Sequence, residues 1–114
     1  MTSFEPGDVV LVRFPFTDLT ALKKRPALIV SPSEFSKRNG DVVIVALTGQ
    51  AQPEQNAALQ DWRSAGLLKP TWLKPLIGTV AATVIERRLG RLSSADHPSV
   101  VATLRTLISR SFMA

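Results

Sequence analysis

The 114-residue sequence predicts a mainly β fold, curled into a small barrel, with one α-helix near the C-terminus. Short runs rich in β-branched residues recur between Pro, Gly and Asn residues, which is typical of strands joined by turns. Apolar residues at clear helical spacing occur in the last stretch of the sequence. With a hydrophobic content of 45%, residues 1–114 are expected to form one domain with its own core.

The first three strands are expected to follow one another closely. Asp8–Phe14 is bounded by Pro and Gly residues and is too short for a typical helix, and Pro26–Ser31 has the same character. Asn39-Gly40 favours a turn, because both residues tolerate positive φ, and it leads into Asp41–Leu47. This close succession predicts an antiparallel meander.

The middle of the chain predicts loops and weaker elements. Pro15–Lys24 and Gly49–Gln60 are rich in polar and turn-forming residues, so we expect both to be exposed loops. Leu67–Leu68 and Thr71–Thr79 are short apolar runs that supply two more strands. Composition favours a helix of one or two turns over Ala81–Arg88.

The last element is predicted to be an amphipathic helix. Its apolar residues recur at helical spacing: Val100, Val101, Leu104, Leu107 and Ile108. Pro98 falls in the first turn, where its missing amide hydrogen does no harm, and Ser94 or Asp96 can cap the start. We therefore expect this helix to close one side of the barrel.

Composition limits the chemistry that the chain can perform. It contains no Cys, which excludes disulfides, thiolate metal sites and Cys nucleophiles, and fits a cytoplasmic protein. No apolar run approaches the ~20 residues that span a bilayer, and Met1–Asp8 lacks the apolar region of a signal peptide. We expect a soluble chain that does not associate with membranes.

The charge of the chain favours a polyanionic partner. Lys and Arg number 14 against 9 Asp and Glu, which gives a formal net charge of +5. Leu19–Ser33 and Trp62–Ile85 contain no acidic residue, and the second stretch holds both tryptophans. Cations interleaved with aromatic side chains suit a single-stranded nucleic acid. The alternative is a solvated basic face, with Trp72 belonging to the core.

Few side chains in the sequence suit catalysis. His97 is the only histidine, which excludes a two-histidine nuclease mechanism. The acidic residues lack metal-ligand spacing and the glycines form no phosphate loop, so we expect neither a metal nor a cofactor. Arg, Lys and hydroxyl groups remain. They suffice for RNA cleavage by the substrate's own 2′-hydroxyl, where the protein aligns the nucleophile and stabilises charge on the phosphate.

Arg25 is the residue best suited to that task. Its guanidinium stays charged at ordinary pH and offers a planar fork of donors that matches phosphate oxygens. Pro26 follows it and biases the backbone toward extended geometry, which would aim the side chain reproducibly. The alternative is an ordinary surface Arg at the start of a strand, and taken alone the residues favour that alternative.

Longer segments resemble toxins of the MazF/PemK family. The resemblance is carried by Gly7–Asp18 and Lys24–Pro32 and continues through Asp41–Thr48, Gly66–Thr71 and Ile85–Ser93 into the last helix, nearly the whole chain. It implies an SH3-like barrel of the CcdB/MazF/PemK type that acts as a homodimer. It also implies metal-independent cleavage of single-stranded RNA at short sequences, and inhibition by a small acidic antitoxin.

The resemblance also assigns roles to single residues. It implies that Arg25 stabilises the pentacoordinate phosphate and helps to transfer the leaving proton, while Thr48 hydrogen-bonds a phosphate oxygen. The alternative for Thr48 is a turn-forming residue before Gly49. Further RNA contacts are expected from residues that flank the two loops: Asp18, Lys23, Lys24, Gln50 and Lys69. Some ribonucleases of the family carry Asp-Gln where this chain has Lys69-Pro70, so their base recognition does not transfer.

Two rival functions share this fold. A toxin of the related CcdB type would poison DNA gyrase through its terminal helix without catalysis. A plain RNA-binding barrel would use the basic stretches for affinity alone. The intact Arg25-Pro26 pair favours the ribonuclease.

Overall fold

The computed structural model describes residues 4–14 and 23–112. Its strands and α-helices, with three 3-10 turns labelled η, follow in the order β1 (Asp8–Phe14), β2 (Lys23–Ile29), α1 (Ser33–Asn39), β3 (Asp41–Thr48), η1 (Gln55–Ala57), β4 (Trp72–Ala81), η2 (Ala82–Val84), β5 (Ile85–Arg91), η3 (Ser94–Asp96) and α2 (His97–Phe112). This confirms the predicted class, mainly β with a C-terminal helix. Most of the loop predicted at Pro15–Lys24 lies outside the described residues.

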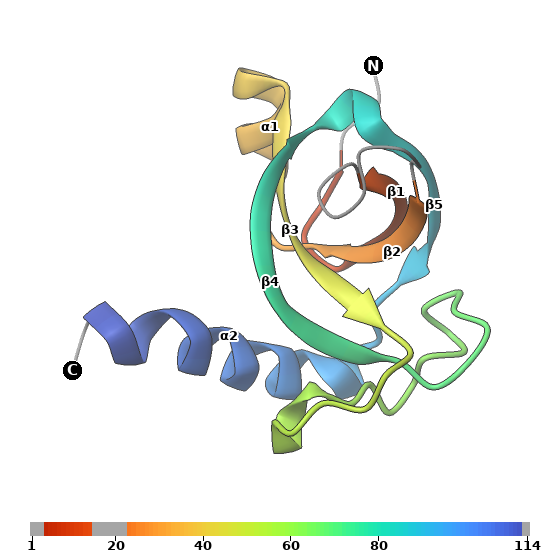
Figure 1. Cartoon of the computed structure of the whole chain (residues 1–114). Helices are drawn as coiled ribbons and strands as arrows, with labels where there is room; N and C mark the ends of the chain where they lie inside the picture. Colours follow the sequence, from red (N-terminus) through yellow and green to blue (C-terminus); the bar gives the residue numbers. More distant parts are fainter. Residues whose placement is uncertain (1–3, 15–22, 113–114) are drawn as a thin grey trace.

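The described strands form one antiparallel sheet in the order β4-β3-β2-β1-β5. Although β4 and β5 are the two edges of this sheet, the three residues of η2 are all that joins them. The sheet must therefore curl until its edges come together, and Figure 1 shows the resulting ring of strands. Within the described residues, β4 and β5 are not hydrogen-bonded to each other, so the small barrel is incompletely closed.

Alternation along the strands sorts the apolar side chains into two clusters. One cluster takes every second residue of β1, β2 and β3 together with two others: Val10, Val12, Ala27, Ile29, Val42, Ile44, Phe4 and Val80. The other packs the opposite face of the strands against the segment before β4 and against α2: Val9, Leu28, Val45, Leu47, Leu73, Ala57, Leu59, Ala65, Leu67, Leu92 and Val100. Successive strand residues point to opposite faces, so the sheet is buried on both sides in its middle.

Ala81–Arg88 is not the short helix that composition predicts. One 3-10 turn occupies its start, and the remainder belongs to β5. Pairing with β1 decides the outcome, since Arg87 lies opposite Leu11 and Arg88 hydrogen-bonds the buried Asp8 carboxylate at 2.9 Å. Tertiary pairing here overrides a helix-compatible composition.

Leu67–Leu68 is also not the predicted strand. It lies in the connection between η1 and β4, where the Leu67 amide donates to the Trp62 carbonyl at 3.1 Å. The chain turns at Gly66, whose φ of +83° is a conformation that side chains other than hydrogen rarely allow. Leu67 therefore packs against the core from a turn instead of joining the sheet, and Leu68 is exposed.

Two glycines allow this connection to approach β5. A Cβ on Gly66 would overlap the carbonyl oxygen of Leu89, and a Cβ on Gly90 would overlap the carbonyl oxygen of Ala65. Backbone-to-backbone contact of this kind requires residues without side chains. The contact fixes the segment Gly66–Thr71 against β5.

The predicted C-terminal helix is confirmed as α2, but Asp96 has a different role from capping. Its buried carboxylate accepts hydrogen bonds from the backbone amides of Gln60 and Asp61 at 2.8 and 2.9 Å. It thereby ties the segment before β4 to the start of the helix. The sequence does not foresee α1, although the turn expected at Asn39-Gly40 forms its C-terminal end.

Candidate active site

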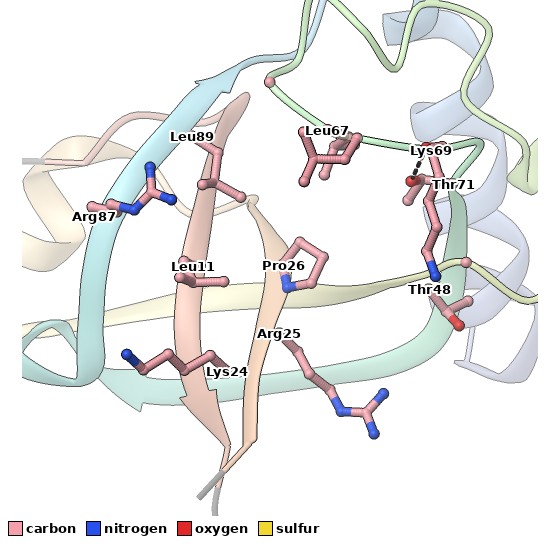
Figure 2. A pocket seen from close by; sticks show the side chains of 13 residues that line it. Leu11, Lys24, Arg25, Pro26, Thr48, Leu67, Lys69, Thr71, Arg87 and Leu89 are labelled. Carbon is pink, nitrogen blue, oxygen red and sulfur yellow. Dashed lines mark hydrogen bonds between the residues drawn. The ribbon is translucent and has the colours of Figure 1, made fainter.

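An open cavity of about 810 Å³ lies between the sheet and the segment Gly66–Thr71. One row across three strands forms its floor, with Arg87 of β5 opposite Leu11 of β1, and Leu11 opposite Pro26 of β2. Leu67 faces this floor from the covering segment (Figure 2). The centre of the cavity is therefore apolar.

Cations surround this apolar centre. The charged side chains that line the cavity in the described part of the chain are Lys24, Arg25, Lys69 and Arg87, and no carboxylate is among them. All four are exposed, so water and salt screen each charge separately. Together, like charges around a hollow produce a positive potential that attracts polyanions. We call this cavity the cationic pocket.

Arg25 is positioned by β2, where it pairs with Val12 of β1. Its side chain is exposed and forms no hydrogen bond or ion pair with any residue that the structure describes. Figure 2 shows it extending from β2 on the side of the pocket where Thr48 and Lys69 also lie. The guanidinium is thus held by a strand but open to a ligand.

Thr48 ends β3 and lines the same side of the pocket. Its Oγ1 accepts a hydrogen bond from the backbone amide of Gln50 at 3.1 Å, as the turn-forming interpretation expects. A hydroxyl has one donor as well as its acceptor sites, so the hydroxyl hydrogen remains able to donate to an anionic oxygen. The turn and the functional interpretation are therefore compatible.

Lys69 reaches across to Thr48 from the covering segment (Figure 2). Its side chain passes over the Gly49 backbone, where an added Cβ would lie 2.7 Å from Nζ. The backbone carbonyl of Lys69 is fixed by the buried Thr71, whose Oγ1 donates to it at 2.8 Å. Two separate segments thus bring the Lys69 ammonium and the Thr48 hydroxyl to the same place.

The other described residues that were predicted to contact RNA do not all line the cationic pocket. Lys24 lines the pocket, but its Nζ lies 3.1 Å from a carboxylate oxygen of Glu86, which compensates part of its charge. Gln50 follows the turn after β3 and is not a lining residue. Lys23 begins β2, and its side chain is not among those described; Asp18 lies outside the described residues.

Comparison of the sequence with known proteins identifies its family. A family model described as "PemK-like, MazF-like toxin of type II toxin-antitoxin system" matches residues 5–108. The chain belongs to this toxin family. No curated protein sequence matches it.

Solved structures share the fold of this PemK-like toxin at low sequence identity. MazF from Deinococcus radiodurans is 17% identical, with a TM-score of 0.76 over 96% of this chain and 99% of that one. An endoribonuclease from a mycobacterial species is 23% identical, with a TM-score of 0.74 over 96% and 94%. A mycobacterial endoribonuclease in complex with its cognate antitoxin is 20% identical, with a TM-score of 0.68 over 96% of each chain.

Arg87 is the charged pocket residue of this toxin that sequence reasoning missed among the described residues. The helix expected over Ala81–Arg88 concealed it, because a helix would not place Arg87 in register with Leu11. The sequence Arg87-Arg88-Leu89 gives no alternating signal, and only the structure shows that Leu89 packs with the core while Arg88 pairs with Asp8. Recognition of a strand there would have placed Arg87 and Leu89 on the pocket side.

Other features of the toxin lie elsewhere. His97 is exposed at the start of α2 and does not line the cationic pocket. Among residues 4–14 and 23–112, no group of three or more His, Asp or Glu side chains is arranged to hold a metal ion. No helix in these ranges has both the length and the apolar character needed to cross a bilayer.

Proposed function

We propose that this toxin is a sequence-specific, metal-independent endoribonuclease that cleaves single-stranded RNA in the cytoplasm. The observation that carries the proposal is the arrangement of Arg25, Thr48 and Lys69 on one side of the cationic pocket. Family membership supports it, as does the fold shared with proteins named endoribonucleases. An exposed guanidinium beside a hydroxyl and an ammonium is a suitable receptor for a phosphodiester.

In the proposed reaction, the RNA supplies its own nucleophile. The 2′-oxygen attacks the adjacent phosphorus and loses its proton, the bond from phosphorus to the 5′-oxygen breaks, and that oxygen takes up a proton. The products are a 2′,3′-cyclic phosphate and a 5′-hydroxyl. Arg25 stabilises charge on the non-bridging oxygens of the pentacoordinate phosphate and assists proton delivery to the leaving oxygen.

Thr48 and Lys69 complete the anion site in this proposal. The Thr48 hydroxyl donates to one non-bridging oxygen, and the Lys69 ammonium adds positive charge beside it. Such fixed donors stabilise a transition state without metal because they are already oriented when the substrate arrives. Lys24, Lys23, Gln50 and Asp18 are proposed to contact RNA further from the scissile bond.

Incubation of the purified protein with unstructured RNA in EDTA tests this function. We expect cleavage at short defined sequences, with termini of the cyclic-phosphate and 5′-hydroxyl type. Binding without cleavage would instead support a plain RNA-binding barrel. Absence of both, with inhibition of DNA gyrase, would support a toxin of the CcdB kind.

The same proposal includes two protein partners. An acidic antitoxin is expected to cover the cationic pocket and block RNA, and a mycobacterial relative is known in complex with its cognate antitoxin. A homodimer is proposed from the resemblance to the family, and Val101 and Ile108, which lie seven residues apart on α2 and are 48% and 49% exposed, are apolar side chains that a partner subunit would cover. Light scattering on the purified toxin would measure the dimer, and a monomer at micromolar concentration would contradict it.

A further inference from the structure

Arg87 lies at the end of the cationic pocket away from Thr48 and Lys69 (Figure 2). We propose that Arg87 selects the base next to the scissile phosphate and that the preferred base is guanine. The inference deepens the proposed ribonuclease function and rests on it for the identity of the ligand. It assigns Arg87 to base selection and leaves the phosphate to Arg25.

The two ends lie on strands that are not neighbours. Arg87 lies on β5 and Thr48 on β3, with β1 and β2 between them. Strands lie about 4.8 Å apart, so the three spacings separate these two backbones by about 14 Å. With the phosphate beside Arg25 and Thr48, the proposal assigns Arg87 to another part of the nucleotide.

The surface between the two ends suits the face of a base. Leu11, Pro26, Leu67 and Leu89 line it, and none offers a side-chain hydrogen-bonding group. Unstacked bases of single-stranded RNA pack their faces on such surfaces and are recognised along their edges. A base that rests there presents an edge toward the guanidinium of Arg87.

The side chains that can meet this edge are donors. Lys24, Arg25, Lys69 and Arg87 have no acceptor atom, and no carboxylate or amide side chain lines the pocket among the described residues. Of the two hydroxyls, Thr71 is buried and already donates to the Lys69 carbonyl, and Thr48 belongs to the phosphate side. A base edge with two acceptors is therefore favoured over an edge that carries an amino group.

Guanine fits this requirement best. Its O6 and N7 are adjacent acceptors that a guanidinium can engage with two parallel hydrogen bonds. The comparison holds for the edge that faces the major groove in a duplex. On this edge adenine places an amino group beside N7, cytosine presents an amino group, and uracil presents the single acceptor O4, so guanine offers the most acceptors to Arg87. Arg87 itself forms no ion pair with a described residue that would compete for its donors.

Binding of RNA that cannot be cleaved separates this inference from catalysis. We would measure the affinity of the wild-type toxin for fully 2′-O-methylated heptamers of adenosine that carry guanosine, inosine, 7-deazaguanosine or adenosine at the centre. Inosine keeps O6 and N7 and should bind like guanosine. The 7-deaza analogue lacks N7 but keeps O6, so it should bind between guanosine and adenosine, and adenosine should bind about tenfold more weakly than guanosine.

Two variants locate the preference. Arg87→Gln should lose the preference for guanosine and shift it toward adenosine, because a Gln amide matches the N6 and N7 of adenine. Arg105→Gln removes the same charge from the exposed surface of α2 and should keep the guanosine preference. A guanosine preference that survives in Arg87→Gln would overturn the assignment, as would an equal loss of affinity for all four heptamers.

The outcomes also distinguish this inference from the proposed function. Equal affinity of the wild-type toxin for guanosine and adenosine heptamers would overturn the inference, even if the protein cleaves RNA. Selective binding of guanosine by a protein that cuts no RNA would keep the assignment of Arg87 and overturn the proposed cleavage.

Discussion

The side chain of Lys69 lies across the backbone of Gly49, which places its ammonium beside Thr48. Gly49 is exposed, and its φ is not positive, so neither burial nor the backbone conformation requires glycine there. Glycine is required there because the Lys69 side chain occupies the space that a Cβ would need. The geometry of the anion site therefore depends on a missing side chain.

Gly49→Ala should weaken RNA binding with little loss of stability. The methyl group would overlap the far end of the flexible Lys69 side chain, which can move away at small cost. Displacement of this ammonium should lower the affinity for single-stranded RNA about fivefold, the effect of losing roughly one charged hydrogen bond. Fluorescence anisotropy and thermal unfolding would measure the two quantities.

Gly78→Ala is the matched control for this change. Gly78 lies in β4, and a Cβ there would meet nothing within 4 Å. RNA affinity should stay at the wild-type value in this variant. If Gly49→Ala bound RNA as tightly as Gly78→Ala, the role given to Lys69 would be wrong.

Arg25→Ala should abolish cleavage without unfolding the protein. Loss of a donor that stabilises the transition state costs about 10²- to 10³-fold in rate, whereas an exposed side chain contributes within about 0.5 kcal/mol to stability. Single-turnover cleavage of RNA in EDTA measures the rate, and urea unfolding measures the stability. Arg105→Ala, the removal of an exposed cation on α2, is the control. Comparable cleavage by both variants would remove Arg25 from the active site.

Glu86→Gln should strengthen RNA binding. Glu86 lies 3.1 Å from Lys24 Nζ and 3.8 Å from Arg13 Nε, so it compensates cations next to the pocket. All three side chains are partly exposed, and the gain should be about two- to fivefold at low salt and should diminish as salt is added. Glu34→Gln, on the exposed surface of α1, controls for net charge. An equal gain in both variants would show a general charge effect only.

Asp8→Asn should destabilise the fold while the pocket chemistry survives. The buried Asp8 carboxylate accepts from Arg91 at 2.7 Å, from Arg88 at 2.9 Å and from the Glu5 amide at 3.0 Å. We expect a loss of about 2 kcal/mol in the free energy of unfolding, less than for a fully buried pair because both guanidinium groups are about half exposed.

Glu5→Gln is the control for Asp8→Asn. Glu5 is exposed and lies 3.7 Å from the same Arg91, so its loss should cost less than about 0.5 kcal/mol. Urea unfolding of the two variants gives the comparison. A similar cost for both would mean that burial of Asp8 adds nothing to its ion pairs.

The sequence predicts those elements whose local pattern agrees with their tertiary environment. Asp8–Phe14 is a strand with the predicted bounds, and the apolar spacing of α2 is sufficient to find it. β5 is hard to recognise in the sequence because it is an exposed edge strand. It therefore carries several charged residues and has no continuous apolar run. Only its pairing with β1 and the ion pair of Arg88 with Asp8 reveal it as a strand.

The candidate site divides in a similar way. Arg25 and Thr48 stand next to recognisable strand boundaries, so the resemblance to the toxin family is enough to select them. Lys69 is harder to select because its position depends on a turn at Gly66 and on space over Gly49, which are properties of the folded chain. Arg87 requires the register between β5 and β1. Side-chain meetings across distant segments are therefore the part that the sequence leaves open.

The mutual approach of Gly66 and Gly90 has a mechanical consequence for target choice. Because the chain that carries Lys69 touches the strand that carries Arg87 through main-chain atoms, these two walls of the pocket should move as one body. The distance between the two walls then does not depend on which side chains line them. Substitutions at positions 68 and 87 should change which RNA is accepted while the frame keeps its dimensions, so that new cleavage specificities can arise without refolding.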